Sequence, residues 1–227
     1  MSGPLDLLEA LARQEVVVTP TYRHLEVFTM RGLLTVLWHG DPDAGAAVVL
    51  GGGAMGGLLG PADGFYHWLG EELATSGSGI GVLRVGWRRP NDVDLCTLDL
   101  LAAADLAARA GAERFVTGGH SFGGAIAIRA AMAMGDWTRG VVTFATQSAG
   151  CEEAHGLTAP LRAYHGDRDE ILPLVSSQVV GQLVGGPAEV LICEGAGHLL
   201  TEAGDRLRTE VPVWIRERLA TGWVATG

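Results

Sequence analysis

Residues 116–126 read VTGGHSFGGAI, and this short stretch decides which fold the chain can adopt. It begins as an apolar run typical of a buried strand and continues into FGGAIAIRAAMAMG, which has the composition of a helix. Between the two lies the G-x-S-x-G pattern of residues 119–123. A strand that turns directly into a helix strains its central residue and admits only small residues beside it. The pattern therefore predicts Ser121 on a sharp turn at the carboxyl end of a strand, at the positive end of the following helix.

The segments on either side of this turn alternate between strand and helix patterns. We expect strands over 46–50, 79–86, 114–119, 140–146, 160–166 and 188–195, and helices over 65–74, 95–111, 122–135 and the C-terminal segment, which Pro212 should break. Residues 25–30 and 33–38 flank Arg31-Gly32 and predict an antiparallel hairpin, and the leucine spacing predicts a short helix over 5–14. This order predicts an α/β fold in one domain, 1–227: a mostly parallel sheet with an N-terminal antiparallel hairpin and helices on both faces.

The composition is that of a folded protein without nucleic-acid or membrane features. The chain has 227 residues, of which 48% are hydrophobic and 19% charged, and its formal net charge is −10. Phosphate backbones select a basic surface, so we expect no nucleic-acid partner. The first residues carry acids instead of a continuous apolar core, and no apolar stretch is long enough to cross a bilayer. Cys96, Cys151 and Cys193 are odd in number and widely spaced, as expected of reduced, packed thiols in a cytoplasmic protein.

Two later segments supply partners for Ser121. A serine hydroxyl is a weak nucleophile that needs a base, and the base needs an acid to orient it. GDRDEILP places Asp167 and Asp169 after the expected strand at 160–166, and EGAGHLL places His198 after the strand at 188–195. The carboxyl ends of parallel strands meet at one edge of a sheet, where ligand sites collect. The chain order serine, acid, histidine is the order that a G-x-S-x-G nucleophile uses.

At this point the chain resembles the α/β-hydrolase superfamily over residues 25–220, on the turn GHSFGG, the acid segment HGDRDEILP and the histidine segment GAGHLL. In related segments of the form HG-x-x-D-x-x-V-P the acid is followed by four residues that end in proline, which here implies Asp169, with Leu172 in the valine's place. The resemblance implies a catalytic triad of Ser121, Asp169 and His198. It also implies a serine hydrolase that cleaves a carboxylic ester or thioester through an acyl-enzyme.

Other carboxylates remain alternatives to Asp169. Asp167 is the rival within the same segment, although its position suits a turn. Some members of the superfamily take their acid after an earlier strand, and that arrangement would point to Glu152 or Glu153.

The glycines of VVLGGGAMGG, residues 48–57, admit two interpretations. Gly51, Gly53 and Gly56 fit G-x-G-x-x-G, the spacing of a dinucleotide-binding loop. That fingerprint needs a helix at the third glycine and an acid about 20 residues on, but Pro61 and Gly64 interrupt the helix, and the acids at that distance lie inside a helical stretch. We therefore interpret the glycines as an oxyanion-binding loop and expect no cofactor.

An oxyanion hole needs two backbone N–H groups, one of which comes from the residue after the nucleophile, here Phe122. The resemblance assigns the second to Gly53, with Ala54 close behind. Related hydrolases often carry His-Gly where this chain has Gly51-Gly52, and this departure leaves the exact donor open. Met55 is expected to face the pocket or to pack under the loop.

The substrate is less defined than the site. Only SAGCEEAHGL separates the strand at 140–146 from the strand beginning at Leu161, which leaves no room for a cap and implies a likeness to small, lidless esterases and dienelactone-hydrolase-like proteins. The dienelactone hydrolases use cysteine where this chain has Ser121. Arg88 or Arg89 could reach the pocket rim and favour an acidic substrate, although a solvated loop is the preferred interpretation of both. We expect a small ester or acyl compound as the partner, and the oligomeric state is not given by the sequence.

The remaining histidines are expected to be structural. Strand spacing could bring His165 near both aspartates of its segment, but no metal-ligand spacing is present and no metal is expected. His120 should point away from the turn. His155 lies in a loop near the expected site, and the other three are interpreted as surface or packing residues: His24, His39 and His67. Fold alone does not settle function, so a non-catalytic binding protein, or acyl transfer or perhydrolysis at the same site, remain alternatives.

Overall fold

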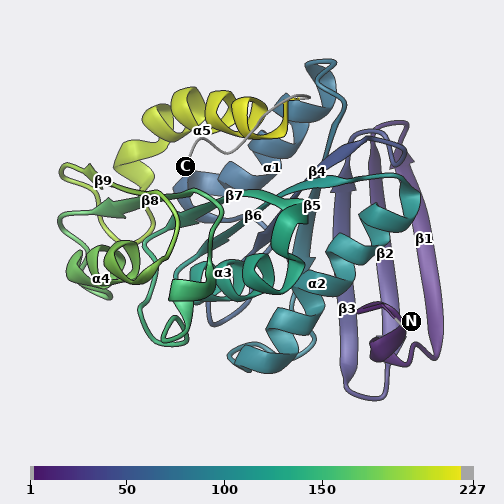
Figure 1. Cartoon of the computed structure of the whole chain (residues 1–227). Helices are drawn as coiled ribbons and strands as arrows, with labels where there is room; N and C mark the ends of the chain where they lie inside the picture. The colour runs from purple at the N-terminus through teal and green to yellow at the C-terminus, as the bar shows by residue number, and fades with distance from the viewer. Residues whose placement is uncertain (1–2, 221–227) are drawn as a thin grey trace.

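The computed structural model describes residues 3–220, which build one nine-stranded sheet between two layers of helices (Figure 1). The strands are β1 (Ala12–Thr19), β2 (Tyr22–Thr29), β3 (Gly32–His39), β4 (Ala46–Gly51), β5 (Ile80–Gly86), β6 (Arg114–His120), β7 (Thr138–Phe144), β8 (Leu161–Gly166) and β9 (Ala188–Cys193). Their order is β1-β2-β3-β5-β4-β6-β7-β8-β9. Neighbours from β5 to β9 are parallel, whereas β1, β2 and β3 are joined to one another and to β5 by antiparallel pairing. The expected α/β fold with an antiparallel hairpin is confirmed.

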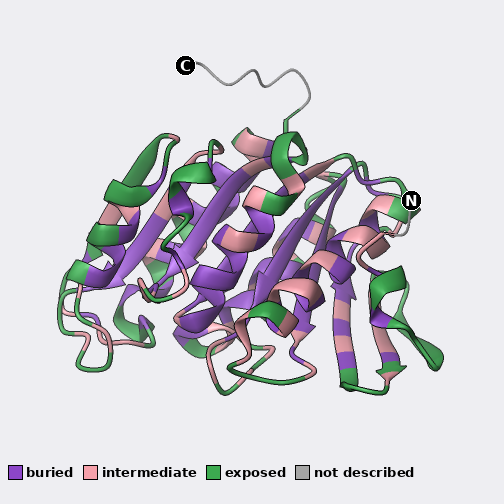
Figure 2. Cartoon of the chain, turned by 60° about the horizontal axis from the view of Figure 1, so that its bottom comes forward, coloured by how far each residue is buried: buried purple, intermediate pink, exposed green. Residues whose placement is uncertain are grey.

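Both faces of the central strands are buried, which explains their continuous apolar runs (Figure 2). The helices are α1 (Pro61–Thr75), α2 (Val93–Ala110), α3 (Phe122–Met134), α4 (Val175–Leu183) and α5 (Gly204–Leu219). One face of β4, with Val48 and Leu50, packs against α1 and α5. The opposite face, with Val49, packs against α2 and α3. Alternate residues of a strand point to opposite faces, so each central strand contributes to both cores.

The N-terminal prediction was wrong. Residues 5–14 form no amphipathic helix; a short 3-10 turn at Asp6–Leu8 ends at Glu9, which has a left-handed backbone, and β1 then begins at Ala12. Leu5 and Leu8 are buried in the core that includes α2, as the leucine spacing suggested, but Leu11 is 66% exposed. The β-branched residues that follow favour a strand, and pairing with β2 provides its hydrogen bonds.

The expected break at Pro212 is also absent, because α5 runs through it from Gly204 to Leu219. Proline removes one helical hydrogen bond, but Val211, Pro212 and Ile215 are all buried on the face that packs against the sheet. Tertiary packing therefore outweighs the local cost. The helix α4 was not predicted.

Two remaining features concern the thiols and the connections. All three cysteines are free and buried. Residues 145–160, between β7 and β8, contain only a 3-10 turn at Ala154–Gly156, so no cap is inserted there. Within residues 3–220, no helix is long and apolar enough to cross a membrane.

Candidate active site

Ser121 occupies the turn between β6 and α3. Its backbone has φ 55° and ψ −117°, a left-handed φ that is strained for a residue other than glycine. Its N–H donates to the carbonyl oxygen of Phe144 on the neighbouring strand, which holds the turn in place. A side chain at Gly119 would overlap the carbonyl of Gly123, and a side chain at Gly123 would overlap the carbonyl of Gly52. These glycines are therefore required by close backbone approach.

His198 and Asp169 form a directly bonded pair after β9 and β8. Nδ1 of His198 lies 2.7 Å from Oδ2 of Asp169, whose side chain is fully buried. The other carboxylate oxygen, Oδ1, accepts hydrogen bonds of 2.8 Å from the N–H groups of Ile171 and Leu172. Burial raises the pKa of Asp169, but these N–H groups and His198 outweigh it, and the pKa lies below its usual value. A charged Asp169 fixes the proton of His198 on Nδ1 and leaves Nε2 as a base.

His120 and His165 support this pair from behind. Nε2 of His120 donates to the carbonyl oxygen of His198 over 2.9 Å, and the two rings lie 4.8 Å apart. Burial lowers the pKa of His120 to about 4, so the ring is neutral. His165 is buried, with Nε2 facing the carbonyl of Leu172 at 3.0 Å and Nδ1 facing the Ser177 hydroxyl at 2.6 Å. His120 is structural, as expected, but its ring lies against His198 and lines the pocket that contains Ser121.

The glycine loop after β4 is held by Trp87. Its indole N–H donates to the carbonyl oxygens of Gly52 at 3.3 Å and Gly53 at 3.2 Å. In a trans peptide the C=O and N–H point in opposite directions, so the N–H groups of Gly53 and Ala54 point away from Trp87. A side chain added at Gly53 would come within 3.9 Å of Cβ of Ser121, which places this glycine beside the serine. Both candidate donors named from the sequence are thus compatible with the loop.

These parts meet in one pocket of about 540 Å³ at the carboxyl edge of the sheet. Ser121, His120 and His198 line it, and among the described residues the Ser121 hydroxyl has no hydrogen-bond partner. The walls consist of glycine and apolar residues, of which four are more than half exposed: Met55, Leu59, Ile171 and Leu199. Within residues 3–220, no Asp, Glu, Lys or Arg side chain lines the pocket.

Other residues singled out in the sequence lie elsewhere. Oδ1 of Asp167 accepts the N–H of Gly195 at 2.7 Å and ties two loops together. Glu152 accepts the N–H of Gly150. Arg88 is buried in an ion pair with Asp99. Arg89 lines a different hollow, beside Arg31, and the side chain of His155 is 71% exposed. None of them contributes to the pocket that contains Ser121.

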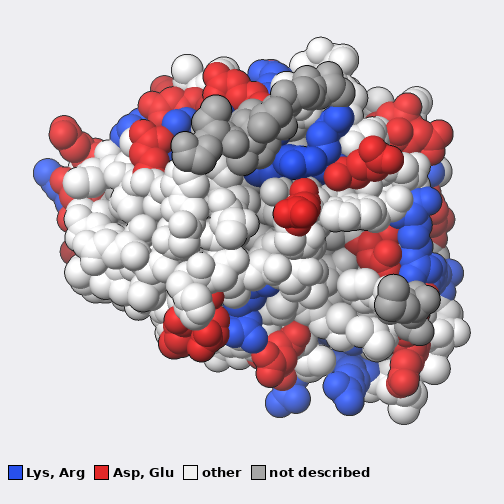
Figure 3. All heavy atoms as spheres, viewed as in Figure 1, with Lys and Arg blue, Asp and Glu red and all other residues white. Residues whose placement is uncertain are grey.

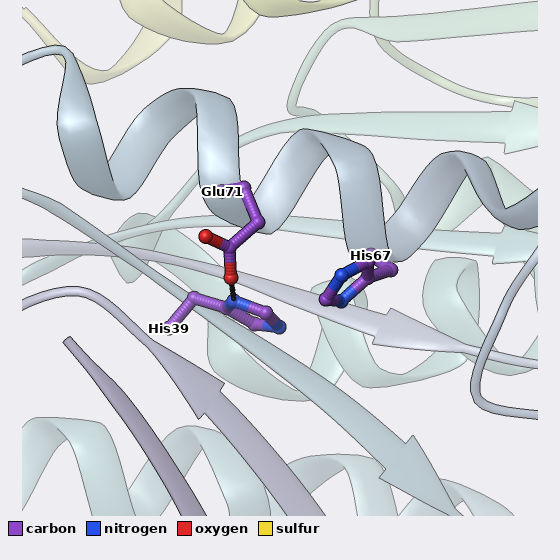
Figure 4. A group of neighbouring side chains, drawn as sticks. All are labelled: His39, His67 and Glu71. Atoms are coloured by element: carbon purple, nitrogen blue, oxygen red, sulfur yellow. Dashed lines mark hydrogen bonds and ion pairs between the residues drawn. The ribbon is translucent and has the colours of Figure 1, made fainter. Parts of the chain in front are cut away.

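In the described part of the chain, one group of side chains has ligand atoms close enough together to hold a metal ion: His39, His67 and Glu71 (Figure 4). Its chemistry argues against one. Arg84 Nε donates to His39 Nε2 at 3.0 Å, so the proton of His39 lies on Nδ1 and faces Glu71 at 2.9 Å. A metal ion bound at Nδ1 of His39 would have to displace that proton. A proton moved to Nε2 would face the buried guanidinium of Arg84. Burial first, and then Arg84, lower the pKa of His39 to about 4.

Instead, Arg84 connects the N-terminal strands to the glycine loop. Its Nη1 donates to the carbonyl of Leu58 in the pocket wall at 3.0 Å, and its Nη2 lies 3.3 Å from the Tyr22 hydroxyl. Sequence analysis missed both Arg84 and Trp87. A single arginine within the apolar run GIGVLRVGW was the available signal, since a charge in a buried strand needs partners.

Comparisons with known proteins agree with this fold. Residues 56–204 match the model of the family described as "Alpha/beta hydrolase family". No curated protein matches the chain. Among solved structures, Est1E from Butyrivibrio proteoclasticus is similar with a TM-score of 0.69 at 15% identity, over 86% of this chain and 98% of that one. A dienelactone hydrolase from Anabaena variabilis gives 0.69 at 17%, over 90% and 96%. A monoacylglycerol lipase from Paleococcus ferrophilus gives 0.65 at 19%, over 82% and 99%. At these identities the likeness is one of fold.

Proposed function

This chain belongs to the alpha/beta hydrolase family, and on that premise we propose that it is a serine hydrolase that cleaves an uncharged carboxylic ester or thioester through an acyl-enzyme. The observation that carries the proposal is the 2.7 Å contact between His198 and Asp169, in the same pocket as the unbonded hydroxyl of Ser121. The similarity in fold to esterases and a lipase supports hydrolysis as the reaction class.

In the proposed reaction, Ser121 Oγ attacks the acyl carbon while Nε2 of His198 takes its proton. Asp169 keeps the imidazole in the required tautomer and stabilises the imidazolium. The N–H groups of Phe122 and Gly53 bind the oxyanion, and each contributes about 3 kcal/mol to lowering the barrier. His198 then returns its proton to the leaving alcohol or thiol. Water, activated by the same histidine, releases the acid and restores Ser121.

The pocket supports an uncharged substrate. No cation lines it, so a substrate carboxylate would find no counter-charge near Ser121. Arg88, which could have favoured an acid, is occupied by Asp99. Apolar groups on the substrate would gain about 25 cal/mol per Å² by covering Met55 and Leu59. The three buried, unpaired thiols fit a reducing compartment, and we propose a cytoplasmic location.

Intact-mass analysis after treatment with a fluorophosphonate probe tests the proposal. We expect one adduct on the wild-type chain, one on Ser148→Ala and none on Ser121→Ala, with all three proteins folded. Absence of an adduct on folded wild-type protein would favour a non-catalytic binding role. Hydrolysis of p-nitrophenyl acetate and butyrate, compared with the anionic p-nitrophenyl hemisuccinate, then tests the substrate class. Equal or better turnover of the hemisuccinate would contradict an uncharged substrate.

A further inference from the structure

The outer edge of β1 is an uncovered sheet edge. β1 pairs only with β2, and its other side is the end of the sheet (Figure 1). All eight residues of Ala12–Thr19 are exposed, so no helix covers either face of this strand. Its sequence, ARQEVVVT, includes Val16, Val17 and Val18, which are 47%, 58% and 54% exposed. Natural proteins usually protect such an edge, because its free N–H and C=O groups can pair with another strand.

The charges on this strand are arranged to match a second copy of themselves. Arg13 and Glu15 stand on the same face of β1, on either side of Gln14. If two β1 strands run antiparallel with Gln14 opposite Gln14, Arg13 of each copy lies opposite Glu15 of the other. The same register places Leu11 opposite Val17 on that face, and Ala12 opposite Val16 on the other. Directly opposed pairs of this kind stabilise antiparallel strands.

The present contacts of Arg13 and Glu15 leave both side chains available for this pairing. The Arg13 side chain makes no hydrogen bond or ion pair within residues 3–220, and its charge also acts on Asp6. Glu15 has one ion pair, to Arg23 on β2 at 2.8 Å, and its side chain remains 43% exposed. Both acidic and basic side chains lie on this side of the molecule (Figure 3). An unrelated extended segment would satisfy these charges only by coincidence, whereas a second copy satisfies them twice through one two-fold axis.

From this palindromic charge pattern we infer that the chain forms a symmetric dimer through antiparallel pairing of β1 with β1, which joins the two sheets into one. One pair of short edge strands buries less than the about 1,600 Å² of a standard stable interface. The dimer therefore forms reversibly as concentration rises. The inference is independent of the proposed chemistry, because β1 lies at the far end of the sheet from β8 and β9.

Sedimentation velocity of the wild-type chain from low to high micromolar concentration tests the inference. We expect a concentration-dependent dimer. Arg13→Glu would oppose two glutamates at each contact, and Glu15→Arg would oppose two arginines. Each variant should weaken dimerisation by about tenfold or more. The two substitutions move the net charge in opposite directions, so a general charge effect cannot produce the same loss in both. Thermal melts establish that the variants are folded.

Recombining the charges gives the decisive comparison. An equimolar mixture of the Arg13→Glu and Glu15→Arg proteins should form a heterodimer, and the double variant should regain the homodimer. Arg31→Glu, at the tip of the β2–β3 turn, is the matched control and should dimerise like the wild type. A wild-type chain that stays monomeric throughout would overturn the inference. A dimer that survives both single reversals would overturn it as well, since it would use another surface.

Discussion

His120 donates a hydrogen bond of 2.9 Å from Nε2 to the carbonyl oxygen of His198, so the residue before the proposed nucleophile fixes the backbone of the proposed base. Two loops that are far apart in sequence are thereby held together by a neutral ring. A neutral His120 carries one ring proton, and the contact places that proton on Nε2. Its low pKa, caused by burial, secures this state at neutral pH.

This low pKa predicts a loss of stability in mild acid. His120 and His39 both have a pKa of about 4 in the folded protein, against 6.5 for a free histidine. The unfolded chain therefore binds more protons between these values, and the free energy of unfolding falls as the pH drops from 6.5 toward 4. Each histidine accounts for roughly 3 kcal/mol over that window. Urea unfolding at several pH values should show this slope, reduced in His120→Gln and unchanged in His155→Gln. An unchanged slope in His120→Gln would contradict the prediction.

The two aspartates after β8 should differ sharply in their effect on activity. Asp169→Asn keeps an oxygen for the N–H groups of Ile171 and Leu172 but presents the wrong partner to His198. We expect kcat on an ester to fall by on the order of 10⁴-fold, as for other triads that lose this charge. Asp167→Asn, which only weakens the contact to Gly195, is the control and should retain kcat within a few-fold. A larger loss at Asp167 would reassign the acid.

Trp87→Phe isolates the orientation of the glycine loop. Phenylalanine keeps most of the buried packing but cannot donate to the carbonyls of Gly52 and Gly53. A less constrained oxyanion donor stabilises the transition state less than before, so kcat should fall by up to about 10²-fold while KM changes little. Steady-state kinetics on a short ester measures the two constants. A change confined to KM would mean that Trp87 shapes the binding of substrate instead of the oxyanion.

The close approach of α3 to the glycine loop predicts opposite outcomes for two glycines. A methyl group at Gly123 would overlap backbone carbonyls of residues 51 and 52, whereas Gly197 has open space around it and no positive φ. Gly123→Ala should lower the free energy of unfolding by about 3 kcal/mol or prevent folding, because backbone cannot move aside cheaply. Gly197→Ala should be neutral or stabilising by up to about 1 kcal/mol. Denaturant unfolding of both variants makes the comparison.

The sheet from β4 onward could be predicted because its strands are short, mainly apolar runs bounded by turns and helices, and β4, β6 and β7 are buried almost throughout. The structure of the N-terminal segment could not be predicted in this way. Leucines at 5, 8 and 11 match the spacing of a helix, but two of them are buried by a single turn against α2 and the third is left outside. Pairing with β2 provides the hydrogen bonds that hold residues 12–19 extended, and the periodicity of the leucines does not encode a partner.

The same distinction holds at the site. Ser121, Asp169 and His198 follow strand ends, and strand ends are visible in a sequence. The residues that support these three side chains cannot be recognised from the sequence in the same way. Trp87 acts on a loop more than thirty residues earlier, and Arg84 reaches Leu58, His39 and Tyr22 at once. Such contacts depend on which strands become neighbours, and the crossover of β4 and β5 in the sheet brings them together.

The position of His198 beyond β9, the outermost strand on its side, has a consequence for biosynthesis. A nascent chain that has left the ribosome only as far as Asp169, just after β8, contains Ser121 and the proposed acid, but it lacks His198, the proposed base. The hydroxyl stays unreactive until the last strand has been added to the sheet and its loop has closed over the acid. On the proposed mechanism, acyl compounds therefore do not react with the growing polypeptide, and reactivity toward them begins only when the fold is finished.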